Sequence, residues 1–255
     1  MINAIKTLVK ASGVVVFLSL VLLSACNNDE PVRNQCEESI SSTSANKIMP
    51  LGASRVEGAH PLFESYRFEL WKLLVSNQQE FDFIGSMCDR PIYPTFEGQN
   101  FDLNHEGRGG YTSEQILSGV SGWLEEAGTP DIVLFSSPGG NDALQNLPYD
   151  NAVNNIVTII DILQNANPNV IIVIELAAPA RSDFMTATLT NYFNQMREDI
   201  VTIATTRATP TSNIITVDMA TGFTDNMLAD DVHYNETGAA FIAQRYYEVL
   251  QNILD

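Results

Sequence analysis

Short apolar runs alternate along this chain with longer segments whose apolar residues recur at helical spacing. The apolar runs cover residues 47–51, 81–84, 131–136, 170–176 and 214–217. Each is followed by a segment with helical periodicity, at 61–77, 113–124, 151–165, 184–205 and 235–254. Strands that alternate with helices favour a parallel sheet, because each helix serves as the crossover to the next strand. The pattern predicts an α/β fold, a flavodoxin-like three-layer sandwich with a five-stranded parallel sheet.

The N-terminal segment differs in composition from the rest of the chain. Lys6 and Lys10 precede an apolar stretch at 14–23, and Leu-Ser-Ala-Cys ends that stretch at Cys26. A basic start, a short apolar stretch and small residues before a break are typical of a secretory signal peptide. The stretch is short for a bilayer span. The segment also matches the bacterial lipobox, which predicts cleavage before Cys26 and lipidation of its thiol.

These features divide the chain into three parts. We expect a lipoprotein signal peptide at 1–25, a polar tether at 26–45 and one folded domain at 46–255. The predicted location is the bacterial cell envelope, outside the cytoplasm, with the lipid on Cys26 as the link to the membrane. An ordinary signal peptide followed by a chance cysteine is the alternative.

The charge of the chain limits its partners. The formal net charge is −18, with 31 acidic and 13 basic residues. Removal of residues 1–25 takes away two lysines and no acid, which brings the charge to −20. A chain this acidic has no basic stripe to neutralise phosphates, so nucleic acid is excluded and anionic lipid surfaces are disfavoured. A neutral glycan or a small ester is a compatible substrate.

Three cysteines are present, and one of them is assigned to the lipid. Cys36 and Cys88 remain, and they either form a disulfide that joins the tether to the domain or stay as two thiols. The sequence contains no Cys-x-x-Cys pair and no histidine cluster. We therefore predict no metal site and no cofactor.

Small polar motifs follow the apolar runs. Ser54 comes after the first run, a glycine cluster occupies 107–110, Asn141 comes after the third run, and Asp230-x-x-His233 precedes the last helix. The carboxyl ends of parallel strands meet at one edge of a sheet, so we expect these segments to converge there. A serine nucleophile, a histidine base, an aspartate that orients it and donors for an oxyanion together suit acyl transfer to water.

The motifs resemble those of the SGNH (GDSL-type) hydrolases, and they are most similar to the acetylxylan-esterase-like branch. The resemblance implies that Ser54 is the nucleophile and His233 the base, with Asp230 as the acid three residues before it. It also implies that Gly110, Asn141 and the Ser54 backbone N–H form the oxyanion hole. The resemblance runs from about Lys47 to the C-terminus. Further similar segments lie at 66–71, 81–86 and 105–107.

One residue departs from the family pattern. The family usually has Gly-Asp-Ser in its first block, whereas this chain has alanine at position 53. In the family that aspartate braces the nucleophile loop, and Ala53 cannot do so. Within the glycine cluster, Gly107 or Gly109 could replace Gly110 as the oxyanion donor, although Gly110 fits the family spacing best.

The chain has three histidines, of which His233 is the preferred base. His60 lies close to the serine in sequence and has no acid spaced to orient it, and His105 belongs to a His-Glu-Gly segment with a structural or rim role. Asp230 precedes His233 by about one turn, so one loop can present both side chains. Asp231 is the alternative acid.

The sequence predicts a serine esterase that removes small acyl groups, acetyl above all, from a carbohydrate. Two alternatives remain open. A lysophospholipase or thioesterase would have a broad apolar groove beside Ser54. A catalytically weak SGNH-like binding module would fit the alanine at position 53.

Overall fold

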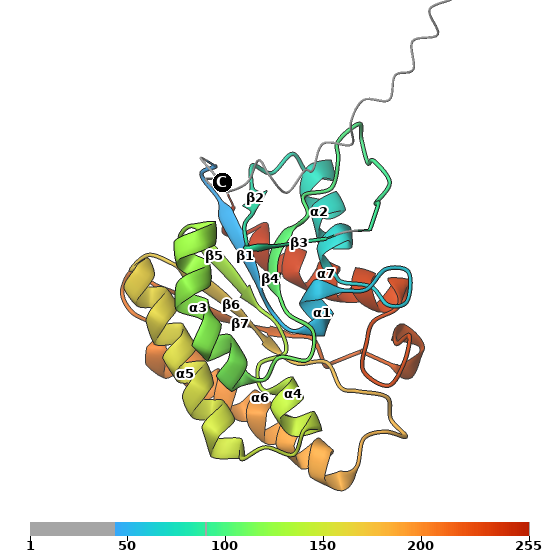
Figure 1. The fold of residues 1–255 in the computed structure, drawn as a ribbon, viewed down its shortest axis with the longest axis vertical. Coiled ribbons are helices and arrows are strands. Elements are labelled where there is room, and N and C mark those ends of the chain that lie inside the picture. The colour runs from blue at the N-terminus through green and yellow to red at the C-terminus, as the bar shows by residue number, and fades with distance from the viewer. Residues whose placement is uncertain (1–43, 90, 255) are drawn as a thin grey trace, which may run out of the picture. The chain divides into compact units, whose positions relative to one another are not determined.

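A mostly parallel sheet of seven strands organises the part of the chain that the computed structural model describes, residues 44–89 and 91–254 (Figure 1). The strand order is β3-β4-β1-β5-β6-β7, and β2 pairs with the beginning of β1. Neighbouring strands are parallel except β3, which runs antiparallel to β4. The strands are β1 Lys47–Gly52, β2 Asp82–Phe83, β3 Met87–Cys88, β4 Asn104–Gly107, β5 Ile132–Phe135, β6 Ile171–Leu176 and β7 Ile214–Asp218.

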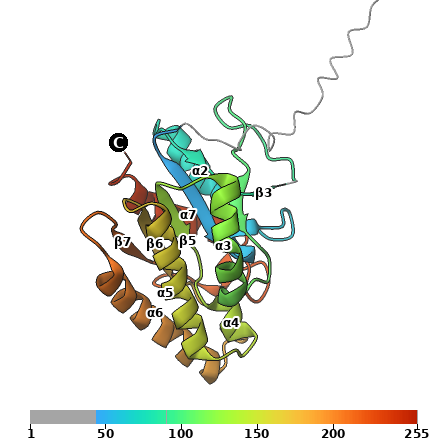
Figure 2. The ribbon, with the colours of Figure 1, turned by 60° about the vertical axis from the view of Figure 1, so that its left-hand side comes forward.

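Helices cover both faces of this sheet, which confirms the predicted α/β sandwich. Helices α3, α5 and α6 pack over one face and α2 and α7 over the other, as Figures 1 and 2 show from two directions. The helices are α1 Ser54–Glu57, α2 Arg67–Ser76, α3 Ser113–Ala127, α4 Gly140–Leu144, α5 Tyr149–Ala166, α6 Ala187–Arg207 and α7 Glu236–Leu250. A separate apolar core lies on each face, so the sheet is buried on both sides.

The five predicted strands are all present, but the edge beside β1 is more complex than the sequence indicated. β2 pairs with the first half of β1 and β4 with the second half, so two short strands fill the place expected for one. We expected residues 104–107 to be part of a long loop, because Asn-His-Glu-Gly lacks the apolar character of a strand. All four residues are nevertheless buried, and the side chains of the first three bond to polar groups of neighbouring segments.

The helix expected at 61–77 begins only at Arg67. The preceding residues form a loop whose backbone hydrogen bonds go elsewhere. The Ala59 N–H donates to the Phe63 carbonyl, and the Glu64 N–H donates to the Tyr234 carbonyl at 2.8 Å. This loop therefore joins the segment after α1 to the segment just before α7.

Helix α3 begins with a side-chain cap. The Thr112 side chain accepts a hydrogen bond from the Gln115 N–H, and the Gln115 side chain accepts one from the Thr112 N–H. This capping box satisfies two amide groups at the start of the helix. It also fixes the end of the glycine-rich segment at 107–110, which lies immediately before it.

Several sequence predictions concern residues outside the described ranges. These are the signal peptide, the lipidation site Cys26, the tether up to residue 43, and Cys36. Cys88 is disulfide-bonded, so the alternative of two thiols is wrong, and a disulfide between Cys88 and Cys36 stays a hypothesis. Within residues 44–89 and 91–254, no helix has the length and apolar character that a membrane span requires. Over the same ranges no group of three His, Cys, Asp or Glu residues could hold a metal ion.

Candidate active site

Ser54 lies at the carboxyl end of β1, near the middle of the sheet. The strand ends at Gly52, the chain turns through Ala53, and Ser54 opens the single-turn helix α1. The hydroxyl Oγ of Ser54 lies 2.9 Å from Nε2 of His233, although the two residues are 179 positions apart. The parallel topology thus brings together the two groups that the sequence predicted to meet.

His233 and Asp230 come from one exposed loop between β7 and α7. Nδ1 of His233 lies 2.7 Å from Oδ2 of Asp230. A carboxylate can only accept, so Nδ1 carries the proton and Nε2 is left to accept the Ser54 hydroxyl proton. The second oxygen of Asp230 accepts the backbone N–H groups of Val232 and His233 at 2.8 and 2.7 Å.

These bonds set the charge state of Asp230. Partial burial alone would raise the pKa of Asp230, but the hydrogen bonds from the His233 side chain and from two backbone amides outweigh it. The pKa therefore lies below its ordinary value of 3.8. A carboxylate that stays ionised holds the imidazole in one tautomer and can stabilise an imidazolium.

The alternative acid and the other histidines have different partners. Asp231 faces Arg181, with Nε of Arg181 at 3.4 Å from its Oδ1. Nδ1 of His60 lies 2.8 Å from the Glu64 carboxylate. His105 is 1 % exposed and is enclosed in a buried cluster. None of these three side chains is hydrogen-bonded to the serine.

Phe63 packs against the face of the His233 imidazole. Its ring stacks on that of His233, with centroids 3.9 Å apart and planes inclined by 14°. The hydrogen bonds to Ser54 and Asp230 fix the imidazole within its plane, and the stacked ring restricts its tilt. No sequence pattern indicates this contact, because it depends on how the loop at 59–64 folds back.

Asn141 lies in the first turn of α4, directly after the turn that follows β5. Its side-chain Nδ2 donates to the Tyr111 carbonyl at 2.8 Å. An amide nitrogen carries two protons, so this bond anchors the group and leaves one N–H to donate. Asn141 and Ser54 both line the same pocket.

The backbone amides of the glycine cluster differ in their hydrogen-bond acceptors. The Gly107 N–H donates to Nδ1 of His105 at 2.9 Å, and the Gly109 N–H donates to the Glu57 carboxylate at 2.6 Å. The Gly110 N–H donates to no protein acceptor within the described residues, and its φ of 78° suits glycine. Of the three candidates for an oxyanion donor, Gly110 is thus the one whose amide is available.

Gly107 has a different reason to be glycine. A Cβ atom there would lie 2.3 Å from the backbone nitrogen of Glu57. Strand β4 therefore passes so close beneath α1 that no side chain fits between them. This contact positions α1, which carries Ser54, and does not supply a hydrogen-bond donor for an oxyanion.

Arg67 braces the turn that carries Ser54 from behind, a contact that the sequence did not predict. Arg67 is fully buried. Its guanidinium donates to the carbonyls of Val56 and Glu57 in α1 at 2.7 and 3.1 Å. It also donates to both oxygens of Asp89 at 2.7 Å. This ion pair braces the serine-bearing helix, a role that Ala53 cannot fill.

His105 completes the buried cluster behind α1. Its Nε2 lies 3.1 Å from the Asp89 carboxylate, while Nδ1 accepts the Gly107 N–H. Burial and then the neighbouring Arg67 guanidinium lower the pKa of His105 from 6.5 to about 4, so the ring is neutral at neutral pH. Burial alone would raise the pKa of Asp89, but Arg67 and His105 outweigh it and lower that pKa.

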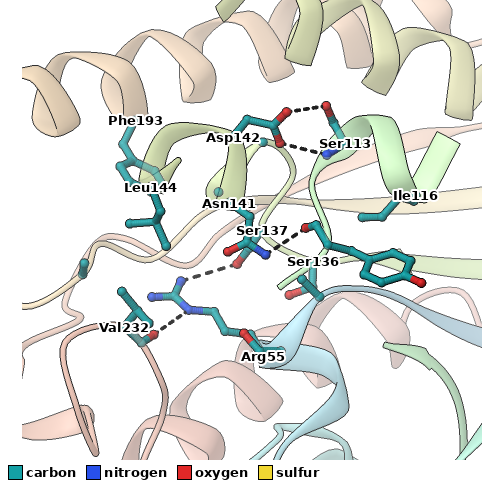
Figure 3. Close-up of a pocket in the computed structure, with 16 residues that line it drawn as sticks. Arg55, Ser113, Ile116, Ser136, Ser137, Asn141, Asp142, Leu144, Phe193 and Val232 are labelled. Atoms are coloured by element: carbon teal, nitrogen blue, oxygen red, sulfur yellow. Dashed lines mark hydrogen bonds between the residues drawn. The ribbon is translucent and has the colours of Figure 1, made fainter. Parts of the chain in front are cut away.

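A small pocket opens beside Ser54, with a volume of about 50 Å³. Ser54, Asn141 and Tyr111 line it together with Leu144, Ile116 and Phe193. Figure 3 shows Leu144 and Phe193 on one side of the pocket and Ile116 on the other. A single water needs at least about 10–15 Å³ measured in this way, so the pocket has room for only a few non-hydrogen atoms.

A buried glutamate holds Ser137, one of the residues that line this pocket. Glu175 of β6 is fully buried, and burial raises the pKa of its carboxyl. It accepts the backbone N–H and the hydroxyl of Ser137 at 2.7 and 3.1 Å, and Tyr246 donates to it at 2.8 Å. Ser137 adopts a positive φ of 46°, and these bonds hold it in that turn. The turn leads directly into α4, which carries Asn141.

Residues 92–241 match the GDSL-like lipase/acylhydrolase family, and the chain belongs to that family. The match includes Gly110, Asn141, Asp230 and His233 and begins after Ser54. The activity of the family makes this chain a carboxylic ester hydrolase. No curated protein is significantly similar to the chain in sequence.

Solved structures with the same fold include several carbohydrate esterases. A family 3 carbohydrate esterase from Talaromyces cellulolyticus is 28% identical with a TM-score of 0.70, and the match covers 82% of this chain and 97% of that one. An acetyl esterase variant with an acetate ion gives the same four values. A family 3 carbohydrate esterase from Clostridium thermocellum is 28% identical with a TM-score of 0.66, covering 82% and 99%.

Proposed function

We propose that this protein is a serine esterase that removes small acyl groups, acetyl in particular, from carbohydrate through a Ser-His-Asp triad. The observation that carries the proposal is the continuous hydrogen-bonded chain from Ser54 through His233 to Asp230. It has the geometry that activates a serine hydroxyl, since nucleophile, base and acid lie within hydrogen-bond distance in that order.

The proposed reaction has two halves. Nε2 of His233 takes the hydroxyl proton as Oγ of Ser54 bonds to the ester carbonyl carbon. Asn141, Gly110 and the Ser54 N–H donate to the oxyanion. The ester C–O bond then breaks, and the alcohol leaves with the proton from His233. Water adds to the acyl-serine and gives its proton to His233, which returns it to Ser54 as the acid departs.

The size and lining of the pocket support a short acyl group. About 50 Å³ beside the serine, lined by Leu144 and Phe193, suits a methyl better than a long chain. A lysophospholipase or long-chain thioesterase would need a larger apolar groove at this place. The structural similarity to carbohydrate esterases and to an acetyl esterase supports an acetylated sugar as the substrate class. The net charge of −18 is compatible with a neutral glycan.

We also propose that the enzyme works in the bacterial cell envelope, tethered by a lipid on Cys26. The lipobox sequence Leu-Ser-Ala-Cys supports this proposal, together with the basic and apolar residues before it. A surface enzyme of this kind would meet polymeric glycans that do not enter the cell.

The test compares the parent protein with Ser54→Ala on p-nitrophenyl acetate and on acetylated xylo-oligosaccharides. We expect the parent to release acetate from both and the variant to lose activity by at least about 10³-fold. A fluorophosphonate probe should label the parent and leave the variant unlabelled. Equal hydrolysis by the two proteins would show that Ser54 is not the nucleophile. Hydrolysis of the chromogenic ester alone would retain the esterase but reject the carbohydrate substrate.

A further inference from the structure

Arg55 is the residue next to the proposed nucleophile, and its side chain reaches three other segments of the site. Nε donates to the Val232 carbonyl at 2.9 Å, in the loop that carries His233. The two terminal nitrogens donate to the carbonyls of Ala178 and Pro179 at 2.9 and 3.2 Å, in the loop after β6. Figure 3 shows the guanidinium between Val232 and Ser137, with a hydrogen bond to each.

The contacts of Arg55 are those of a structural clamp. It makes four hydrogen bonds, three of them to backbone carbonyls and the fourth, at 3.4 Å, to the Ser137 hydroxyl. A guanidinium has five N–H donors, so nearly all are in use within the protein. Within the described residues Arg55 forms no ion pair with a carboxylate, and its cation lies over the Tyr234 ring at 4.7 Å.

The loop that carries the base needs such a clamp. The side chain of Asp230 is 51% exposed, and no strand or helix contains residues 230–233. Val232 immediately precedes His233, so a bond to its carbonyl fixes the backbone that carries the imidazole. Because Arg55 immediately follows Ser54, the same side chain ties the backbone of the nucleophile to the backbone of the base.

We propose that Arg55 is a positioning residue that sets the distance between Ser54 Oγ and His233 Nε2, and so sets the rate of proton transfer. This inference rests on the proposed function. Proton transfer requires the two atoms at about 2.6–3.2 Å, and a misplacement of about 1 Å can lower a rate by about 10²-fold. Arg55 does this without contact with the reacting atoms.

The geometry requires the planar fork of arginine. The four acceptors lie in three different segments, and one rigid guanidinium meets all of them. Lysine carries a positive charge too, but its ammonium is a single point on a flexible stem and cannot span the same acceptors. Charge alone therefore does not replace Arg55.

The chain offers a matched control in Arg197 of α6. Its Nε and a terminal nitrogen both donate to the Ala177 carbonyl, at 3.0 and 2.9 Å, at the start of the same loop after β6. Arg197 is also half-buried, but its hydrogen bonds within the described residues do not reach α1 or residues 230–233. A loss that came only from loosening of the loop after β6 would appear in both arginines.

The experiment measures kcat and KM for p-nitrophenyl acetate with the parent, Arg55→Met, Arg55→Lys and Arg197→Met. Near-ultraviolet circular dichroism and thermal unfolding report folding of each. We expect kcat of both Arg55 variants to fall by about 10²-fold with KM within about threefold, and fluorophosphonate labelling to slow in parallel. We expect Arg197→Met to keep kcat within about threefold, because it leaves the Ser54–His233 distance unchanged.

A rescue experiment separates positioning from stability. We expect millimolar guanidinium to restore at least about tenfold of the lost kcat in Arg55→Ala and to leave Arg197→Ala unchanged. If Arg55→Met does not fold, Arg55→Lys and the rescue decide. The inference is overturned if Arg55→Lys keeps the parent kcat, if Arg197→Met loses as much as Arg55→Met, or if guanidinium restores nothing. A parent without esterase activity would instead reject the proposed function.

Discussion

The two partners of the proposed proton transfer are supported in different ways. Ser54 lies on a helix that is braced from behind by a buried cluster of Arg67, Asp89 and His105, with side chains 5% exposed or less. His233 lies on a loop whose acid is half-exposed, and hydrogen bonds from polar side chains and backbone amides hold that loop. The proposed nucleophile is therefore held by buried side chains, whereas the proposed base lies on a loop at the surface.

This contrast predicts which substitutions lower activity without lowering the stability of the domain. Removal of a partner from the buried cluster leaves a desolvated charge or donor, which destabilises the whole domain. Removal of a partner from the exposed loop leaves groups that water can satisfy, so the fold survives while the geometry of the base is lost. Three predictions test this contrast.

The largest effect on activity is expected from Asp230→Asn. The amide would present an N–H to Nδ1 of His233 and favour the tautomer that cannot accept the Ser54 proton. We expect kcat to fall by roughly 10³–10⁴-fold, with the midpoint of urea unfolding almost unchanged. Asp231→Asn is the matched control and should keep kcat within about threefold, because Asp231 faces Arg181 instead. A reversed order of the two variants would make Asp231 the acid.

A smaller loss is expected from Asn141→Ala, on the scaffolded side of the site. Its amide is anchored by the Tyr111 carbonyl, and its second N–H is the proposed donor to the oxyanion. Loss of one such donor lowers kcat by about 10²–10³-fold, and KM should change little. Steady-state kinetics with p-nitrophenyl acetate measures both. If only KM changed, Asn141 would bind substrate without stabilising the oxyanion.

The smallest effect on activity, and a distinctive effect on stability, is expected from His105→Gln. Burial lowers the pKa of His105 from 6.5 to about 4, so the unfolded chain binds more protons than the folded one between those values. Stability therefore falls as the pH drops through this window, and this one group contributes roughly 3 kcal/mol of the change. In the variant the slope should be shallower by up to about 1.4 kcal/mol per pH unit.

Urea unfolding of both proteins at pH 7.0, 5.5 and 4.5 measures that slope. An identical slope for His105→Gln and the parent would mean that the buried cluster does not hold His105 neutral. It would also remove one side of the contrast between the two supports.

The sequence was sufficient for the features that depend on local pattern. Apolar runs and helical periodicity predicted five parallel strands, which are β1, β2, β5, β6 and β7, and the long helices. Strands that are buried on both faces of a sheet are continuously apolar, and this makes them recognisable in the sequence. The resemblance of the motifs to the SGNH hydrolases pointed to Ser54, Asn141, Asp230 and His233 as candidate site residues. Their positions after parallel strands predicted separately that they meet at one edge of the sheet. The structure brings these side chains to that edge.

Other features could not be read from the pattern. Strand β4 is polar in sequence, and its burial depends on partners that only the folded chain supplies. Arg67 and Arg55 look like ordinary surface cations in the sequence, yet one is fully buried and the other spans three segments. Their roles depend on which backbone carbonyls lie at the ends of their side chains.

Residue type and periodicity are local properties, so the sequence alone predicts which chemical groups are present and at which edge of the sheet they lie. The way in which those groups are held follows only from the folded chain. Hydrogen-bond distances, burial and the choice between neighbours such as Asp230 and Asp231 depend on contacts between residues far apart in the chain.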